Sequence, residues 1–159
     1  MRIAGLNKND FTNGEGVCVS LFVQGCPHHC AGCFNTETWD FDGGEPAPAN
    51  LKGEIVKAIS ANNITRNFSV LGGEPLCEEN LDSVLNIVSS VRTAYPNIKI
   101  YIWSGYTYEE LLSRNDDRIL KIFKLANFLI DGRYEESLRD ITLPLRGSSN
   151  QRIINLQEV

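Results

Sequence analysis

The sequence contains no apolar run that approaches the ~20 residues of a membrane-spanning helix. It also has no basic excess, because 15 Lys and Arg stand against 20 Asp and Glu, a formal net charge of −5. Nonspecific binding to nucleic acid or to an anionic membrane needs a basic surface, so we expect neither partner and favour a protein or a small molecule. The opening MRIAGLNKNDF lacks the apolar core of a secretory signal and the Arg/Ser-rich character of a transit peptide. We therefore expect a cytoplasmic protein.

Cysteine is sparse and unevenly distributed along the chain. There are five cysteines, and three of them lie in the loop GCPHHCAGCFN, residues 25–35. This is not the spread framework of a small disulfide-rich secreted protein, and a reducing cytoplasm keeps such residues as thiols. The distribution therefore favours metal binding or redox chemistry.

Short apolar runs alternate with helical patterns along the chain. Strands are predicted at 17–25, 68–73, 98–105 and 127–132, with a last strand at 152–156, and helices at 51–63, 80–96 and 108–126. The 159 residues have the size of one domain, so we treat 1–159 as a single domain. The alternation predicts an α/β fold with a parallel sheet covered by helices. The first four strands each end in a glycine-containing or polar turn, and we expect these turns to converge at the carboxyl edge of the sheet.

The spacing C-x3-C-x2-C of Cys26, Cys30 and Cys33 lets one loop place three thiolates on three corners of an iron–sulfur cubane. The fourth iron then has no protein thiolate. A zinc site that takes its fourth ligand from His28, His29, Cys18 or Cys77 is one alternative, and three unmodified thiols are another. We favour the cluster, because zinc sites prefer two separated C-x2-C pairs and no second pair exists; we expect both histidines to face solvent.

The turn GGEP, residues 72–75, follows the second predicted strand. Because Gly73 has no side chain, a ligand can approach the backbone closely there, and the Glu74 carboxylate offers an acceptor for a cation such as an ammonium group. The alternative is an ordinary tight turn with a solvated glutamate.

Together, C-x3-C-x2-C after the first strand and GGEP after the second resemble the radical S-adenosylmethionine superfamily. The resemblance implies that Cys26, Cys30 and Cys33 hold a [4Fe–4S] cluster, and that S-adenosylmethionine completes it through the open iron. It also implies reductive cleavage of that cofactor to a 5′-deoxyadenosyl radical. The chain is shorter than a full eightfold barrel, so the implied fold is a partial, open parallel β/α barrel of reduced size.

Five further motifs are similar to those of the small glycyl-radical activating enzymes: DFTNGEG, CFN, WSGY, IDGRY and RGSSNQ, the last at residues 146–151. The match is strongest to the members that act on anaerobic ribonucleoside-triphosphate reductase. It implies a glycyl radical made on the large subunit of that reductase, with one electron from a reduced flavodoxin-like donor. The implied contacts to S-adenosylmethionine come from Gly32, Cys33, Phe34, Gly73 and Glu74. The alternatives are an activase of another glycyl-radical enzyme, a small radical enzyme acting on a free metabolite, or a nonenzymatic iron–sulfur or zinc module.

Several residues near these motifs are open to two interpretations. Many relatives carry an aromatic residue directly before the third cysteine, where this chain has Gly32, and Glu15 stands where the N-terminal motif has proline. We expect Cys18 in the core, Cys77 as a loop thiol without function, and Trp103 and Tyr106 in the wall of the pocket or in the core. Asp131 either contacts the cofactor or a cation, or it caps a helix. Arg146 and Asn150 meet the partner or the cofactor carboxylate, or else lie in a solvated tail.

Overall fold

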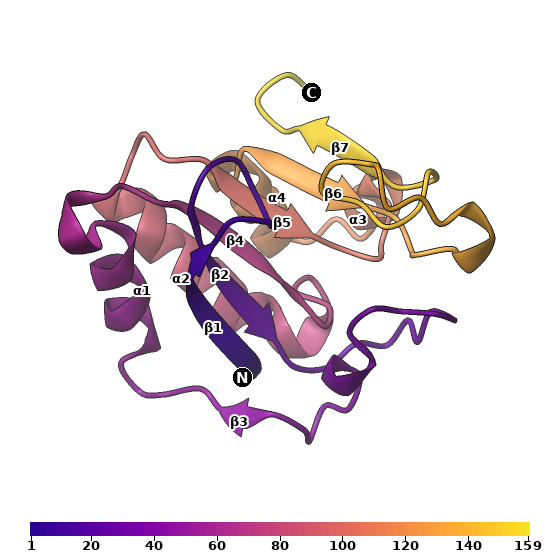
Figure 1. Ribbon diagram of the computed structural model, residues 1–159, viewed down its shortest axis with the longest axis horizontal. Helices are drawn as coiled ribbons and strands as arrows, with labels where there is room; N and C mark the ends of the chain where they lie inside the picture. The colour runs from indigo at the N-terminus through magenta and orange to yellow at the C-terminus, as the bar shows by residue number, and fades with distance from the viewer.

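The computed structural model describes all 159 residues. Seven strands form one sheet in the order β3-β1-β2-β4-β5-β6-β7 (Figure 1). The strands are β1 (Arg2–Asp10), β2 (Cys18–Val23), β3 (Glu45–Pro46), β4 (Asn67–Gly72), β5 (Ile100–Trp103), β6 (Phe128–Asp131) and β7 (Arg152–Asn155). The helices are α1 (Leu51–Ile59), α2 (Glu78–Ala94), α3 (Tyr108–Ser113) and α4 (Asp117–Leu125).

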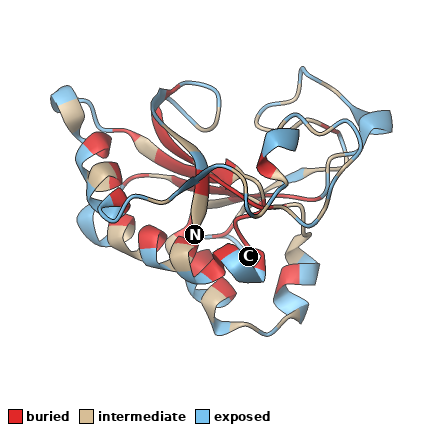
Figure 2. Ribbon diagram, turned by 90° about the horizontal axis from the view of Figure 1, so that it is seen from below, coloured by how far each residue is buried: buried red, intermediate tan, exposed pale blue.

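The four central strands, β2, β4, β5 and β6, run parallel, which confirms the predicted α/β class. They are neighbours in chain order, and right-handed crossovers between successive neighbours put every connecting helix on the same face of a sheet. The helices accordingly form one layer on one side of the sheet (Figure 2). In that layer α2 packs against both α1 and α4. The opposite face is left to loops.

Antiparallel strands flank this parallel centre. Neither β1 nor β3 was predicted; both run antiparallel to their neighbours at one edge. The sequence of β1, RIAGLNKND, has only a four-residue apolar stretch, which contains Gly5, and most of its residues are at least partly exposed. At the other edge β7 runs antiparallel to β6 and confirms the predicted last strand. The sheet is open, with β3 and β7 at its two ends.

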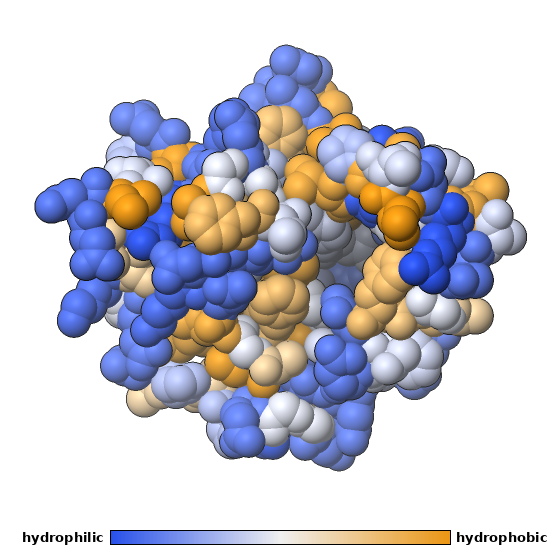
Figure 3. Space-filling view, in the orientation of Figure 1, coloured by the Kyte–Doolittle hydropathy of each residue, from blue (hydrophilic) through white to orange (hydrophobic).

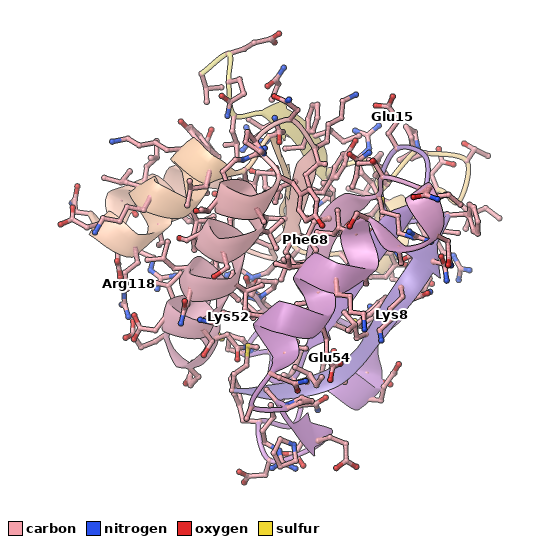
Figure 4. The ribbon with its side chains drawn as sticks, turned by 90° about the vertical axis from the view of Figure 1, so that its left-hand side faces the viewer. Lys8, Glu15, Lys52, Glu54, Phe68 and Arg118 are labelled. Atoms are coloured by element: carbon pink, nitrogen blue, oxygen red, sulfur yellow. The ribbon has the colours of Figure 1, made fainter.

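The apolar core lies between the sheet and the helical layer, where 26 buried side chains form one cluster. Phe68 of β4 is fully buried beneath the helices, whereas Lys52 and Arg118 lie on their outer side (Figure 4). The structure has no helix of the length and apolarity needed to traverse a bilayer.

The predicted helix at 108–126 is wrong in one respect, because it is two helices. Asn115 has a positive φ of 49°, which ends α3. Asp116 then begins α4 as its N-cap, with its side chain accepting a hydrogen bond from the backbone N–H of Arg118.

Candidate functional site

The turns after β2, β4, β5 and β6 converge as predicted, and together they line a cavity of about 130 Å³. The three loop cysteines, Gly73 and Glu74 all contribute to its wall. A second hollow of about 380 Å³ adjoins it and shares Cys33, Asn35, Trp103 and Tyr134 with the first. In Figure 3 the surface is hollowed on the right-hand side, between the cysteine loop below and the C-terminal segments above, as Figure 1 places them.

The cysteine loop leaves β2 through Gly25, whose φ of 95° favours glycine. The backbone N–H groups of Gly25 and Cys26 donate to the carbonyls of Thr38 (2.8 Å) and Trp39 (3.1 Å). The two ends of the loop are thereby joined beside the sheet. The thiols project from the segment between these ends.

The three thiols are reduced and partly exposed. Burial raises the pKa of Cys26 to about 11, although the backbone N–H groups of His28 and His29 favour its thiolate. Burial also raises the pKa of the Cys30 thiol. Both thiols are therefore protonated at neutral pH until a metal displaces the proton.

The donor set suits an iron–sulfur cluster. No three side chains of His, Cys, Asp or Glu gather around a point that would hold a single metal ion. The ligands of a cubane cluster are arranged differently, because each thiolate binds a different iron atom, so the three cysteine sulfur atoms surround the cluster without approaching one another. The indole N–H of Trp39, a residue in the wall of the same cavity, is buried without an acceptor. An N–H group in this position suits a cluster sulfur as its acceptor.

The Glu74 carboxylate is fully buried and accepts hydrogen bonds on both oxygens. Oε1 accepts from Leu76 N (2.8 Å) and Ser104 Oγ (2.9 Å), and Oε2 accepts from Gly105 N (2.7 Å) and faces His28 Nε2 (2.8 Å). The alternative of a solvated glutamate is therefore wrong. The backbone carbonyl of Gly73, at the same cavity, accepts no hydrogen bond from the protein.

The two histidines have different surroundings. His29 is exposed as predicted, and its ring stacks on Trp39 with a centroid separation of 4.6 Å. The prediction for His28 is wrong, because only 5% of its side chain is exposed and its Nε2 is hydrogen-bonded to the Glu74 carboxylate. The cause is a partner 46 positions along the chain, which no local pattern in the sequence reveals.

Phe34 lies at the rim, 56% exposed, with its ring 5.0 Å from that of Tyr134. The contact depends on Gly147, since a Cβ at that position would lie 2.7 Å from the Phe34 ring. Gly32 is similarly constrained, with a φ of 75° and a Cβ position that would overlap the Glu136 carboxylate. The cysteine loop therefore packs closely against the segment after β6.

The RGSSNQ segment is a folded turn, so the alternative of a solvated tail is wrong. The Gln151 side chain accepts from the N–H groups of Gly147 (2.9 Å) and Ser148 (3.2 Å) and donates to the Gly132 carbonyl (2.9 Å). Asn150 donates to the Arg133 carbonyl at 2.8 Å. Arg146 lies in the wall of the larger hollow, and its buried Nε has no acceptor.

The remaining residues have structural surroundings. Asp131 caps α3 by accepting from Tyr108 N (2.7 Å) and pairs with both Nε and Nη2 of Arg152. Cys18 is fully buried in β2, as predicted. Cys77 lies in the loop directly before α2, as predicted, where it is buried, and burial raises its pKa to about 12.

Trp103 lies in the wall of both hollows, whereas Tyr106 packs edge-on against the His28 ring. The site residue that the sequence analysis missed is Trp39, for which no motif gives a signal.

The mostly parallel, open sheet carries three loop thiols at its carboxyl edge, and a family model described as "4Fe-4S single cluster domain" matches residues 12–154. This match places the chain in the iron–sulfur class of proteins. The anaerobic ribonucleoside-triphosphate reductase-activating protein of Escherichia coli K12 is 35% identical over 149 residues, which cover 93% of this chain and 94% of that protein. Proteins of the same name from Enterobacteria phage T4 and Pasteurella multocida are each 37% identical, over 144 residues (91% of this chain, 87% of that protein) and 145 residues (91% and 90%).

The chain therefore belongs to the family of the anaerobic ribonucleoside-triphosphate reductase-activating proteins.

Proposed function

We propose that this protein activates anaerobic ribonucleoside-triphosphate reductase by generating a glycyl radical on the large subunit of that enzyme. The observation that carries the proposal is that one cavity is lined by the three loop cysteines and by Gly73, whose backbone carbonyl has no hydrogen-bond donor in the protein. The names of the relatives supply the target.

In this proposal Cys26, Cys30 and Cys33 hold a [4Fe–4S] cluster, and S-adenosylmethionine binds the iron that has no thiolate. When bound, the cluster would supply one electron to cleave the sulfonium to methionine and a 5′-deoxyadenosyl radical, and hydrogen-atom transfer from a backbone glycine would then give 5′-deoxyadenosine and the glycyl radical. The electron comes from a reduced flavodoxin-like donor.

The site offers separate partners for the charged ends of S-adenosylmethionine. The Gly73 carbonyl is a free acceptor for the ammonium group, whereas the Glu74 carboxylate already has four neighbours and no exposed surface. Glu74 therefore contributes to cofactor binding through the shape of its turn. The buried Nε of Arg146 suits a carboxylate in the larger hollow.

Gly32, Cys33 and Phe34 complete the proposed contacts. Cys33 and Phe34 line the larger hollow, which gives room for the nucleoside part of the cofactor.

The open sheet is consistent with a reduced form of the radical S-adenosylmethionine barrel, in which residues 1–159 act as one cytoplasmic domain. Helices cover one face, and the opposite face carries the hollows (Figures 2 and 3). A sheet that does not close leaves its site accessible to a loop of another protein. This geometry favours a protein substrate over a free metabolite.

The test is anaerobic reconstitution with iron and sulfide, followed by reduction and addition of S-adenosylmethionine. We expect about four irons per chain, cubane absorption, and formation of 5′-deoxyadenosine. A colourless protein with one zinc would refute the proposal and support a zinc module, and a cluster that never cleaves S-adenosylmethionine would indicate a nonenzymatic carrier. Productive turnover without any reductase present would favour an enzyme that acts on a metabolite.

A further inference from the structure

The segment between Cys26 and Cys33 has little backbone support. None of the N–H groups from His28 to Gly32 donates to a backbone carbonyl, and the one internal turn is the bond from Cys33 N to the Cys30 carbonyl (3.1 Å). Such a loop has many accessible conformations, and each cysteine must nevertheless be held at a defined place. Some other group must hold the loop.

His28 supplies that attachment, because it is the one side chain between Cys26 and Cys33 with a hydrogen bond to a residue outside the loop, whereas the exposed His29 only stacks on Trp39. Its Nε2 lies 2.8 Å from Glu74 Oε2. Its ring meets Tyr106 edge to face at 4.4 Å. Gly105 lies directly against the ring, since a Cβ at that position would lie 2.3 Å from His28 Cδ2.

The acceptor for His28 is itself rigidly held. Both oxygens of Glu74 are fixed by backbone N–H groups, those of Leu76 and Gly105, and by the Ser104 hydroxyl. In the tautomer that carries its proton on Nε2, His28 donates the fourth hydrogen bond to this carboxylate. The pair therefore joins the cysteine loop to the turns after both β4 and β5.

The attachment reaches the ligands through the His28 backbone. His28 lies two residues after Cys26 and two before Cys30, so the position of its ring constrains the short backbone segment that joins these two ligands. Loss of a group that orients the ligands of a metal typically weakens metal binding by about 10–100-fold.

We infer that His28 is a positioning residue whose hydrogen bond to Glu74 holds the loop 26–33 in the conformation that accepts the cluster. The inference rests on the proposed function, because it takes Cys26, Cys30 and Cys33 as the ligands. His28 itself binds no iron.

The experiment compares His28→Leu, which removes the donor, with His28→Gln, whose amide nitrogen keeps one, and with Ala31→Ser as the control at an exposed position of the same loop. Amide hydrogen exchange is measured on the metal-free proteins at Cys26 and Cys33, whose N–H groups donate to the carbonyls of Trp39 and Cys30. The rate of cluster loss to an iron chelator is measured on the reconstituted proteins. We expect His28→Leu to exchange about tenfold faster at these two positions and to lose its cluster about 10–100-fold faster than the unmodified protein. His28→Gln and Ala31→Ser should stay within about twofold of it.

Equal exchange and equal cluster loss in His28→Leu and the unmodified protein would overturn the inference. So would a His28→Gln variant as impaired as His28→Leu, because ring packing and not the hydrogen bond would then be responsible. Circular dichroism of the metal-free variants separates both results from global unfolding. If the unmodified protein takes up no cluster, the proposed function fails, while the exchange measurement still tests the attachment of the loop.

Discussion

Replacement of Gly73 by alanine tests how closely the GGEP turn must approach the cysteine loop. A Cβ at this position would lie 2.3 Å from the Gly25 carbonyl oxygen and 3.0 Å from that of Thr38. Both neighbours are backbone atoms at the two joined ends of the loop, so neither can rotate away as a side chain would. The turn and the loop must move apart.

The size of the displacement follows from the contact distance. Ordinary van der Waals contact begins at 3.4 Å, so the two segments must separate by about 1 Å. The bond from Glu74 N to the Gly25 carbonyl, now 2.8 Å, would then lengthen beyond a hydrogen bond. Overpacking of this kind costs about 1–3 kcal/mol of unfolding free energy, and a displacement of about 1 Å between reacting groups costs about 100-fold in rate.

Two assays measure these effects. Urea unfolding of the metal-free protein gives the stability, and 5′-deoxyadenosine formation by the reconstituted, reduced protein gives the rate. Gly53→Ala is the matched control, because nothing lies within 4 Å of its Cβ position in α1. Alanine there should stabilise the protein by about 0.5–1 kcal/mol and leave the rate unchanged. A Gly73→Ala protein with unaltered stability and rate would refute the proposed close approach.

Three further predictions concern other parts of the chain. Cys18→Ala should leave the iron content of the reconstituted protein unchanged, whereas alanine at Cys26, Cys30 or Cys33 should prevent a full cluster from forming. Iron and sulfide analysis measures both, and an equal loss of iron in all four variants would contradict the assignment of the ligands. Arg152→Ala should lower the unfolding free energy by about 2 kcal/mol in urea, because it leaves the buried Asp131 carboxylate without its ion pair. The Arg118 guanidinium lowers the pKa of Asp116 from 3.8 to about 2. The negative charge of Asp116 therefore stabilises the folded protein fully above about pH 4, and this stabilisation is lost as the pH falls to about 2. Asp116→Asn should therefore cost about 1 kcal/mol at pH 7 and progressively less in acid, and a cost independent of pH would contradict this cause.

The parallel centre of the fold was predictable because its signals are local. β2, β4, β5 and β6 are short apolar runs that end in glycine or polar turns, and the helices between them show apolar residues at helical spacing. β1 escaped prediction because Asn7, Lys8 and Asn9 face solvent, and because it is held by pairing with β2 and β3, which its own sequence does not reveal. β3 has two residues, too few for any pattern.

The candidate site was predictable where a motif names the residues, and not where distant partners decide. The cysteine loop and GGEP were predicted to meet, and they line one cavity. His28 and His29 are adjacent and chemically identical, yet only His28 is within reach of Glu74. Glu74 was expected to accept from an ammonium group, but its acceptor positions are occupied by donors from three separate segments. Such donors become visible only when the chain is folded.

The central claim is that the three-cysteine loop holds the cluster that generates a glycyl radical on the reductase. The most direct measurement mixes the reduced, cluster-loaded protein with S-adenosylmethionine and anaerobic ribonucleoside-triphosphate reductase, and records the electron paramagnetic resonance spectrum. The account predicts the doublet of a glycyl radical, which requires all three components and is absent when Cys26, Cys30 and Cys33 are changed to alanine. A doublet that persists in the triple variant, or its absence from the complete mixture, would contradict the account.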